Sequence, residues 1–360
     1  MEMHDLCAIA AGEARCVLAT AVKVEGHAYR KQGVSMLLTE DGRMYGSISP
    51  GCLESDLQAR VKHVLDTGHL AFAEYDMRPE DDLSWGETIG CGGLVVVLLE
   101  PVCGELRSAL TEMHACFKSG SAVEFTRYFQ HNYSLVQYEW HRVDSIDRKL
   151  VPSIDVTRMS FDSYRTEIDQ DVKSTEAEYW NLPLQITTLY TAKPRLIIIG
   201  AGNDAIPVAR LARVSGFHVI IADWREGLCT SDRFPDADLV PGFPAEIMSV
   251  LNIRRGDFLI LMSHQFPRER EFLELLSGSE YAYLGIMGSK TRTARLLNDL
   301  PPPPNLHSPV GLSIGADGPE EIAISIAAEL IACKRAAGTE NCSAQRGSTH
   351  AIDGHSARRR

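Results

Sequence analysis

The stretch RLIIIGAGNDAIPVARLARVSGFHVIIADW, residues 195–224, decides how the second half of the chain folds. An apolar run leads into a glycine turn, and a helix-like pattern then leads into a second apolar run. The turn, residues 200–205, matches G-x-G-x-x-A, the fingerprint that connects a strand to a helix in dinucleotide-binding folds. We therefore predict a strand, a tight turn, a helix and a second strand, which together begin a Rossmann-like parallel-sheet domain.

Individual positions of this stretch have distinct physical roles in such a fold. Gly200 permits the tight turn, Gly202 lets the backbone approach a pyrophosphate, and Ala205 lets the helix pack close to the strand. Asp223 ends the second strand, where an acid accepts a hydrogen bond from a ribose 2′-hydroxyl. Arg225, two residues later, leaves open whether the bound ribose is phosphorylated. A Rossmann domain that binds no redox nucleotide is the alternative, because the fold alone does not establish the chemistry.

A second anion-binding candidate follows in residues 285–292, GIMGSKTR, which combine glycines with a helix start and two cations. Ser289, Lys290 and Arg292 are the candidate ligands, and the alternative is a solvated basic helix face. Among the histidines, His264 and His307 lie near predicted strand ends, but we expect each to be a hydrogen-bonded structural residue.

Outside this half, the sequence pattern predicts an α+β domain at the N-terminus. Strands are expected at 16–24, 35–38, 42–48 and 94–99, and helices at 52–67 and 105–117. The segment 123–189 reads as an antiparallel meander. Residues 258–262 and 281–286 are later strands, and a last helix follows Gly318. We predict domains at 1–120, 121–192 (β-rich) and 193–338, with 339–360 as a disordered tail.

The composition excludes several classes of protein. A net charge of -12 argues against a nucleic-acid partner, because such binding depends on Lys and Arg that neutralise phosphates. The acidic N-terminal segment is unlike a secretory signal, and no apolar run approaches the length of a membrane span. We therefore expect a cytoplasmic protein without a membrane partner. The nine cysteines show no C-x-x-C spacing, so a zinc knuckle is not indicated.

Two cysteines stand in glycine-rich turns, in GSISPGCLE, residues 46–54, and in GCGG, residues 90–93. Glycine beside Cys52 or Cys91 gives a ligand room to approach. Cys52 also lies at a predicted helix start, which favours the thiolate that binds soft metals or accepts sulfur. The alternative for both cysteines is a small buried hydrophobic residue beside a turn.

These turns and three later blocks resemble the XdhC/CoxI family of xanthine and carbon monoxide dehydrogenase accessory proteins. The similar blocks occur in the family's order at residues 26–57, 88–101, 197–209, 283–297 and 307–332. There are departures at Tyr29, where proline is usual, at Pro50, where a second glycine is usual, and at Asn203, where histidine is usual. The first two affect the turn around the cofactor, and the third removes a histidine from the phosphate loop.

The resemblance implies an accessory protein that binds the molybdenum cofactor, a molybdopterin that can carry an added nucleotide. It implies sulfuration of the cofactor with a cysteine desulfurase as partner, and delivery to a xanthine dehydrogenase-type molybdoenzyme of purine catabolism. The family's two motif cysteines fall on Cys52 and Cys91, as the metal ligands, and its motif arginine falls on Arg30. Gly51 and Glu54 flank Cys52 and complete the predicted cofactor site, and a homodimer is left open.

Two other functions compete with the carrier, which we expect to bind and transfer without turnover of its own. The first is an NAD(P)-dependent oxidoreductase that uses the glycine turn for hydride transfer, although no constellation for that chemistry is legible. The second is a sulfur-relay protein in which Cys52 carries a persulfide.

Overall fold

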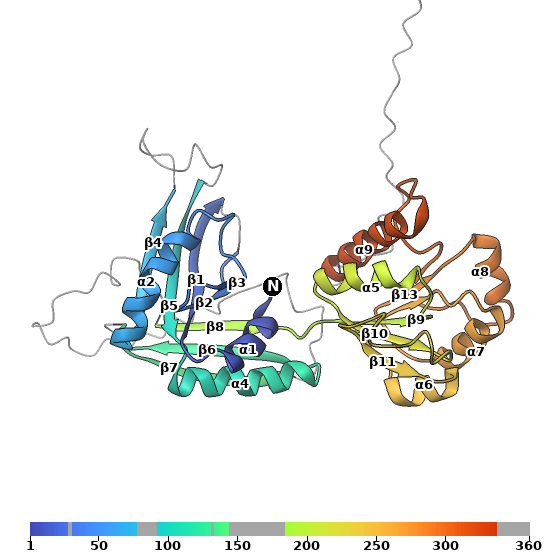
Figure 1. Ribbon diagram of the computed structural model, residues 1–360, viewed down its shortest axis with the longest axis horizontal. Coiled ribbons are helices and arrows are strands. Elements are labelled where there is room, and N and C mark those ends of the chain that lie inside the picture. Colours follow the sequence, from blue (N-terminus) through green and yellow to red (C-terminus); the bar gives the residue numbers. More distant parts are fainter. Residues whose placement is uncertain (28–30, 78–91, 131–132, 144–183, 337–360) are drawn as a thin grey trace, which may run out of the picture. The chain divides into compact units, whose positions relative to one another are not determined.

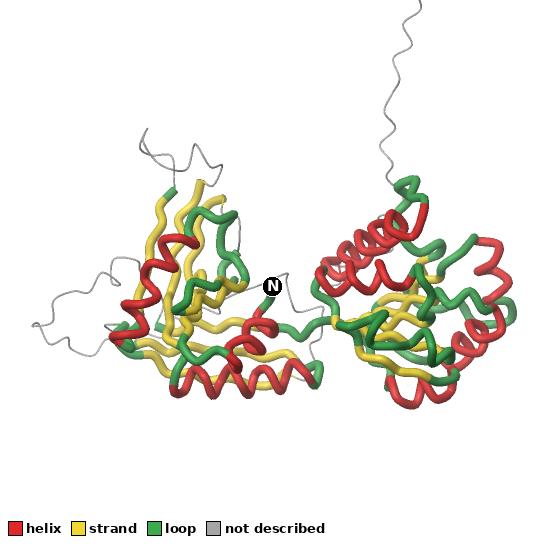
Figure 2. Tube along the Cα trace, in the orientation of Figure 1, coloured by secondary structure: helices red, strands yellow, loops and turns green. Residues whose placement is uncertain are grey.

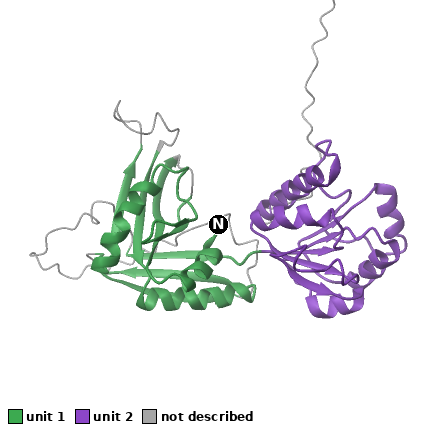
Figure 3. Ribbon diagram, in the orientation of Figure 1, with its two compact units in different colours: residues 1–147, 154–193 green, residues 148–153, 194–360 purple. Residues whose placement is uncertain are grey.

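A computed structural model of the chain describes residues 1–27, 31–77, 92–130, 133–143 and 184–336. Within these residues the chain divides into two compact units, and the boundary lies between Lys193 and Pro194 (Figure 3). Each unit contains its own sheet and its own buried core. The predicted mixed α/β class is confirmed.

The first unit contains a five-stranded antiparallel sheet with the order β3-β2-β1-β5-β4 (Figure 1). Its strands are β1 Cys16–His27, β2 Ser35–Thr39, β3 Met44–Tyr45, β4 Ala71–Asp76 and β5 Gly92–Pro101. Successive residues of a strand point to opposite faces. Val17 accordingly belongs to one hydrophobic core and Leu18 to another, so both faces of this sheet are covered.

The unit has three described helices, α1 Met3–Gly12, α2 Glu54–Thr67 and α4 Gly104–Lys118. α2 packs in the core that contains Val17, whereas α1 and α4 pack in the core that contains Leu18, where α4 lies mainly against α1, β6 and β7. The predicted helix before Gly68 is confirmed as α2. Gly68 ends this helix with φ 69°, the left-handed conformation that glycine favours. The buried stripe of α2 runs through Leu57, Val61 and Val64, and Leu65 beside it is only partly buried. Among the described helices, none is long and apolar enough to cross a membrane.

A second, three-stranded sheet completes this unit with β6 Ala122–Phe129, β7 Val136–Val143 and β8 Gln185–Tyr190. All pairs are antiparallel, as predicted, but the order is β7-β6-β8, so the prediction of a meander was wrong. β6 is the central strand and buries Phe125, Arg127 and Phe129, whereas β7 is partly exposed along its length. The chain therefore returns to the free edge of β6.

The second unit is a six-stranded parallel sheet with the order β11-β10-β9-β12-β13-β14. The strands are β9 Arg195–Ile199, β10 His218–Asp223, β11 Asp238–Pro241, β12 Phe258–Leu261, β13 Tyr283–Ile286 and β14 Leu306–His307. This is the strand order of a Rossmann fold. It reverses between β9 and β12, and ligand crevices in such sheets form beyond the carboxyl ends of the strands at that point.

Helices pack on both faces of the parallel sheet, as Figure 2 shows. One core contains α5 Ala205–Val214 and α9 Gly318–Ala336, and the other contains α6 Pro244–Leu251, α7 Phe266–Leu276 and the short α8 Lys290–Leu296. The predicted strand, turn, helix and strand over residues 195–224 are confirmed as β9, α5 and β10. Because the glycine turn directly follows β9, it lies at the carboxyl ends of the parallel strands.

Candidate functional site

The turn that precedes α2 is held by the carboxylate of Glu54, which is 7% exposed. The backbone N–H groups of Ile48 (3.1 Å) and Ser49 (2.8 Å) donate to Glu54 Oε1, and the Ser49 hydroxyl donates to Oε2. Burial raises the pKa of Glu54, but the hydrogen bonds from Ser49 and the backbone outweigh it and lower that pKa below its ordinary value. Glu54 is therefore an ionised clamp on the turn.

Ser49 extends this clamp toward the cysteine. Its Oγ accepts hydrogen bonds from the backbone N–H groups of Gly51 and Leu53, each at 3.1 Å. Cys52 lies between these two residues, is partly buried and packs against the core under α2. Gly51 has φ 128°, and a Cβ built there would meet nothing within 4 Å. The turn thus holds the thiol two residues before α2 begins, and not within the helix as predicted, next to the open space at Gly51.

The other residues predicted for this site, Arg30 and Cys91, lie outside the described residues. Within the described ranges, no three His, Cys, Asp or Glu side chains group as metal ligands. Joint ligation by Cys52 and Cys91 therefore stays a prediction.

The glycine turn of the second unit brings the ends of β9 and β12 into contact. Gly200 has φ 122°, and a Cβ built there would lie 2.6 Å from the Cα and backbone N of Ser263. Only glycine allows this approach. At Gly202 a Cβ would lie 2.6 Å from Asp204 Oδ1, so the carboxylate of Asp204 lies over Gly202.

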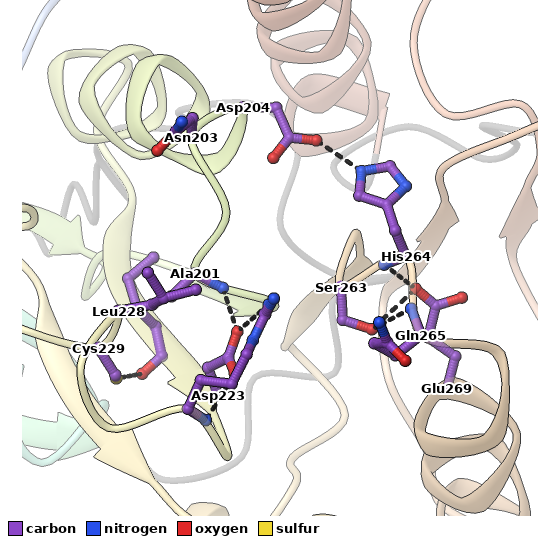
Figure 4. Close-up of polar contacts among 12 residues, drawn as sticks. Ala201, Asn203, Asp204, Asp223, Leu228, Cys229, Ser263, His264, Gln265 and Glu269 are labelled. Atoms are coloured by element: carbon purple, nitrogen blue, oxygen red, sulfur yellow. Dashed lines mark hydrogen bonds and ion pairs between the residues drawn. The ribbon is translucent and has the colours of Figure 1, made fainter.

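Asp223, the predicted ribose acceptor, is fully buried and bonded within the chain (Figure 4). The backbone N–H of Ala201 donates to Asp223 Oδ2 at 2.6 Å, and the Arg225 guanidinium donates to Oδ1 and Oδ2 at 3.0 and 2.8 Å. Burial raises the pKa of Asp223, but the bonds from Arg225 and Ala201 outweigh it and lower that pKa. The carboxylate fixes the glycine turn in place.

His264 lies three residues after the end of β12 and faces this turn. Its Nε2 lies 2.7 Å from Asp204 Oδ2, and its side chain is 57% exposed (Figure 4). The backbone of His264 is left-handed at φ 59°, which is uncommon for a residue with a side chain. Its N–H donates to Glu269 Oε1 at 2.9 Å, which holds that conformation.

Glu269 links His264 to the second predicted anion-binding segment. The carboxylate is 1% exposed and accepts from Ser263 Oγ at 3.0 Å and from the Arg292 guanidinium at 2.6 Å. Ser289 caps α8, because its Oγ accepts from the Arg292 backbone N–H at 3.2 Å. Ser289 and Lys290 are exposed, whereas the Arg292 charge is already paired with Glu269.

The sequence reasoning did not find Asp204 or Glu269. The only signal for Asp204 was an acid inside the glycine fingerprint, and for Glu269 an acid in the first turn of an amphipathic helix. His307 is buried and pairs with Glu329 at 3.1 Å, as expected for a structural histidine.

Comparison with known proteins finds relatives along most of the chain. Residues 196–330 match the XdhC Rossmann domain, and residues 9–76 match the XdhC and CoxI family. The chain is 37% identical over 332 residues to a Bacillus subtilis (strain 168) protein named as a probable xanthine dehydrogenase subunit, covering 92% of this chain and 96% of that protein.

A more distant relative and a solved structure also match most of the chain. The chain is 24% identical over 334 residues to the Escherichia coli (strain K12) molybdenum cofactor insertion chaperone PaoD, covering 91% of this chain and 86% of the relative. A crystal structure described as a xanthine dehydrogenase from Bacillus halodurans has a TM-score of 0.75 at 37% identity, over 97% of this chain and 98% of the other.

Proposed function

Because this chain belongs to the XdhC and CoxI family, we propose that it is an accessory protein that binds the molybdenum cofactor, supports its sulfuration and delivers it to a xanthine dehydrogenase-type molybdoenzyme. One relative is named as a molybdenum cofactor insertion chaperone, which supports the cargo. Another is named as a probable xanthine dehydrogenase subunit, which supports the recipient. A cysteine desulfurase is the proposed sulfur donor.

The observation that carries the proposal is the clamped turn around Cys52. Molybdenum held by a dithiolene prefers soft sulfur ligands, and Cys52 offers a thiol beside the unfilled space at Gly51. Glu54 and Ser49 fix the backbone on both sides of the thiol, so little freedom is lost when cargo binds. Glu54 positions Cys52 here, since both of its oxygens already accept bonds from the turn.

The test is to purify the full chain from a host that makes the cofactor and to measure bound molybdenum and pterin. The loaded protein is then mixed with an apo-dehydrogenase, with and without prior incubation with a desulfurase. We expect stoichiometric molybdenum and pterin, and activation that depends on the loaded protein and is higher after sulfuration. A chain that carries neither molybdenum nor pterin would show the proposal to be wrong.

Nicotinamide turnover is not part of the proposal. The acid that would accept a ribose hydroxyl, Asp223, is buried and bonded to Ala201 and Arg225. We expect no sustained, protein-dependent oxidation or reduction of NAD(P), which an absorbance assay of the nicotinamide measures directly.

A further inference from the structure

We propose that Asp204 makes the glycine turn of the second unit reject pyrophosphate-bearing dinucleotides. In this fold the second glycine of the turn lacks a Cβ so that a pyrophosphate can approach the backbone. Here the Asp204 carboxylate lies over that glycine, with Oδ1 2.6 Å from the position of a Gly202 Cβ. The chain therefore places its own anion where the ligand's anion would lie.

The electrostatics of the turn favour this internal anion. Asp204 immediately precedes α5, a helix of 10 residues whose N-terminus attracts negative charge. Asp204 already supplies one negative charge there, and His264 holds it from the opposite side of the switch point at 2.7 Å. A pyrophosphate would have to displace the carboxylate and break this pair, or be repelled by it.

The backbone that carries the pair is fixed, so Asp204 and His264 are held facing each other across the turn. Glu269 holds the left-handed backbone of His264, and the Arg292 guanidinium holds Glu269. On the other side, the backbone N–H of Met262 donates to the carbonyl oxygen of Ile199 at 2.9 Å, which ties the residue before the turn to the residue after β12.

The ribose subsite is closed in the same way. Arg225 covers Asp223 with two side-chain hydrogen bonds, and the negative charge of Asp204 also acts on the Arg225 guanidinium. Both polar subsites of a dinucleotide are therefore bonded within the chain. This inference is independent of the cofactor-carrier proposal, and it sets a condition on phosphate binding at residues 200–205: the Asp204 carboxylate must be displaced or neutralised.

The test is a gain of binding in Asp204→Asn. Asparagine keeps the size of the side chain, can still accept a bond from His264, and is favoured at a helix start, so the variant should fold. NAD, ADP and adenosine are titrated calorimetrically into the full-length wild type and the variant. We expect NAD and ADP to bind the variant at least about tenfold more tightly than the wild type, and adenosine, which has no phosphate, to show no gain.

Asp238→Asn is the matched control. Asp238 Oδ2 pairs with His218 Nε2 at 2.8 Å, which is a second His–Asp contact of the same length class, located at the amino ends of β10 and β11 and away from the glycine turn. This variant should bind NAD no more tightly than the wild type. The proposal fails if the wild type binds NAD as tightly as Asp204→Asn, if the control gains equally, or if a folded Asp204→Asn, verified by circular dichroism, gains nothing.

Discussion

His264 Nε2 lies 2.7 Å from Asp204 Oδ2, although the two residues are 60 positions apart in the sequence. The pair joins the loops that follow β12 and β9, the neighbouring strands between which the order of the parallel sheet reverses. An acid inside a glycine fingerprint is thereby a structural partner of a histidine from another loop. The glycine fingerprint therefore predicts the path of the backbone. It does not predict which side chain pairs with the acid inside the turn, and only the structure shows that partner.

The thiol of Cys52 should be needed for molybdenum loading. Cys52→Ser keeps the size of the side chain and loses the soft donor, so bound molybdenum should fall several-fold while the fold is retained. Metal analysis of the purified variant measures this. Cys116→Ser, on α4 and also partly buried, should load like the parent. Full loading and full activation by Cys52→Ser would make the thiol a packing residue.

Glu54 should affect loading without touching the cargo. Glu54→Gln replaces the acceptor for the Ser49 hydroxyl and two backbone N–H groups, so the turn should loosen at a cost of about 1–3 kcal/mol in the free energy of unfolding. Alkylation of Cys52 should change in rate and bound molybdenum should fall. The exposed Glu40→Gln is the control. If alkylation and loading are unchanged while stability falls, Glu54 serves the fold only.

The two glycines of the second unit should respond differently to alanine. Gly200→Ala would force a Cβ against the Ser263 backbone at a left-handed φ, which should destabilise the unit by about 3 kcal/mol or more. Gly202→Ala meets only the movable end of Asp204 and should cost less than about 1 kcal/mol. Urea denaturation followed by circular dichroism compares them, and equal losses would contradict the contact described for Gly200.

A single substitution in the buried pair Glu100–Arg127 should destabilise the fold strongly. Both side chains are 0% exposed and their charged atoms lie 2.8 Å apart, joining β5 to β6. Arg127→Met leaves an uncompensated buried carboxylate and should cost about 3–5 kcal/mol, part of which Glu100→Gln restores in the double variant. Arg60→Met breaks the exposed pair with Asp56 and should cost less than about 1 kcal/mol. A double variant less stable than Arg127→Met would contradict this assignment.

Glu329 should give the second unit a specific acid sensitivity. Burial raises its pKa, but hydrogen bonds from His307, Tyr283 and the Gly311 N–H outweigh it and lower the pKa from 4.5 to about 2. A lowered pKa in the folded state stabilises the fold above pH 4.5, and this stabilisation is lost as the pH falls from 4.5 toward 2.

Glu329→Gln should remove this contribution, which we expect to be about 1–3 kcal/mol. Urea denaturation at pH 7 and pH 3 measures it, and the difference between the two pH values should be smaller in the variant. Glu320→Gln, exposed on the same helix, should retain the wild-type difference. An unchanged pH dependence in Glu329→Gln would assign the acid sensitivity to other groups.

Local sequence patterns predicted the elements whose ends are marked by characteristic residues. Gly68 predicted the end of α2, and the glycine fingerprint predicted β9, α5 and β10. The strand order of the three-stranded sheet was not predictable in this way. β8 pairs with β6 at the edge that β7 leaves free, and no local pattern shows which edge that is. Periodicity describes a strand's faces and not its neighbours.

The roles of charged residues depended on distant partners. Glu54 looked like a cofactor contact because it follows Cys52, and only the distances to Ile48 and Ser49 identify its bonds to the turn. Glu100 ends an apolar strand and is buried there because Arg127 lies opposite on another sheet. Such pairs need the folded geometry, since nothing in the spacing of the two residues along the chain predicts them.

The β7-β6-β8 order has a consequence for synthesis on the ribosome. β8 is the last strand of the first unit to emerge, and only residues 191–194 separate it from β9. Until Tyr190 leaves the exit tunnel, β6 presents an unpaired edge to its surroundings, a template for wrong partners. The Asp5–Lys193 contact at 2.6 Å then joins the first helix to the residue before the next unit, so the first unit is completed just as the second begins to appear.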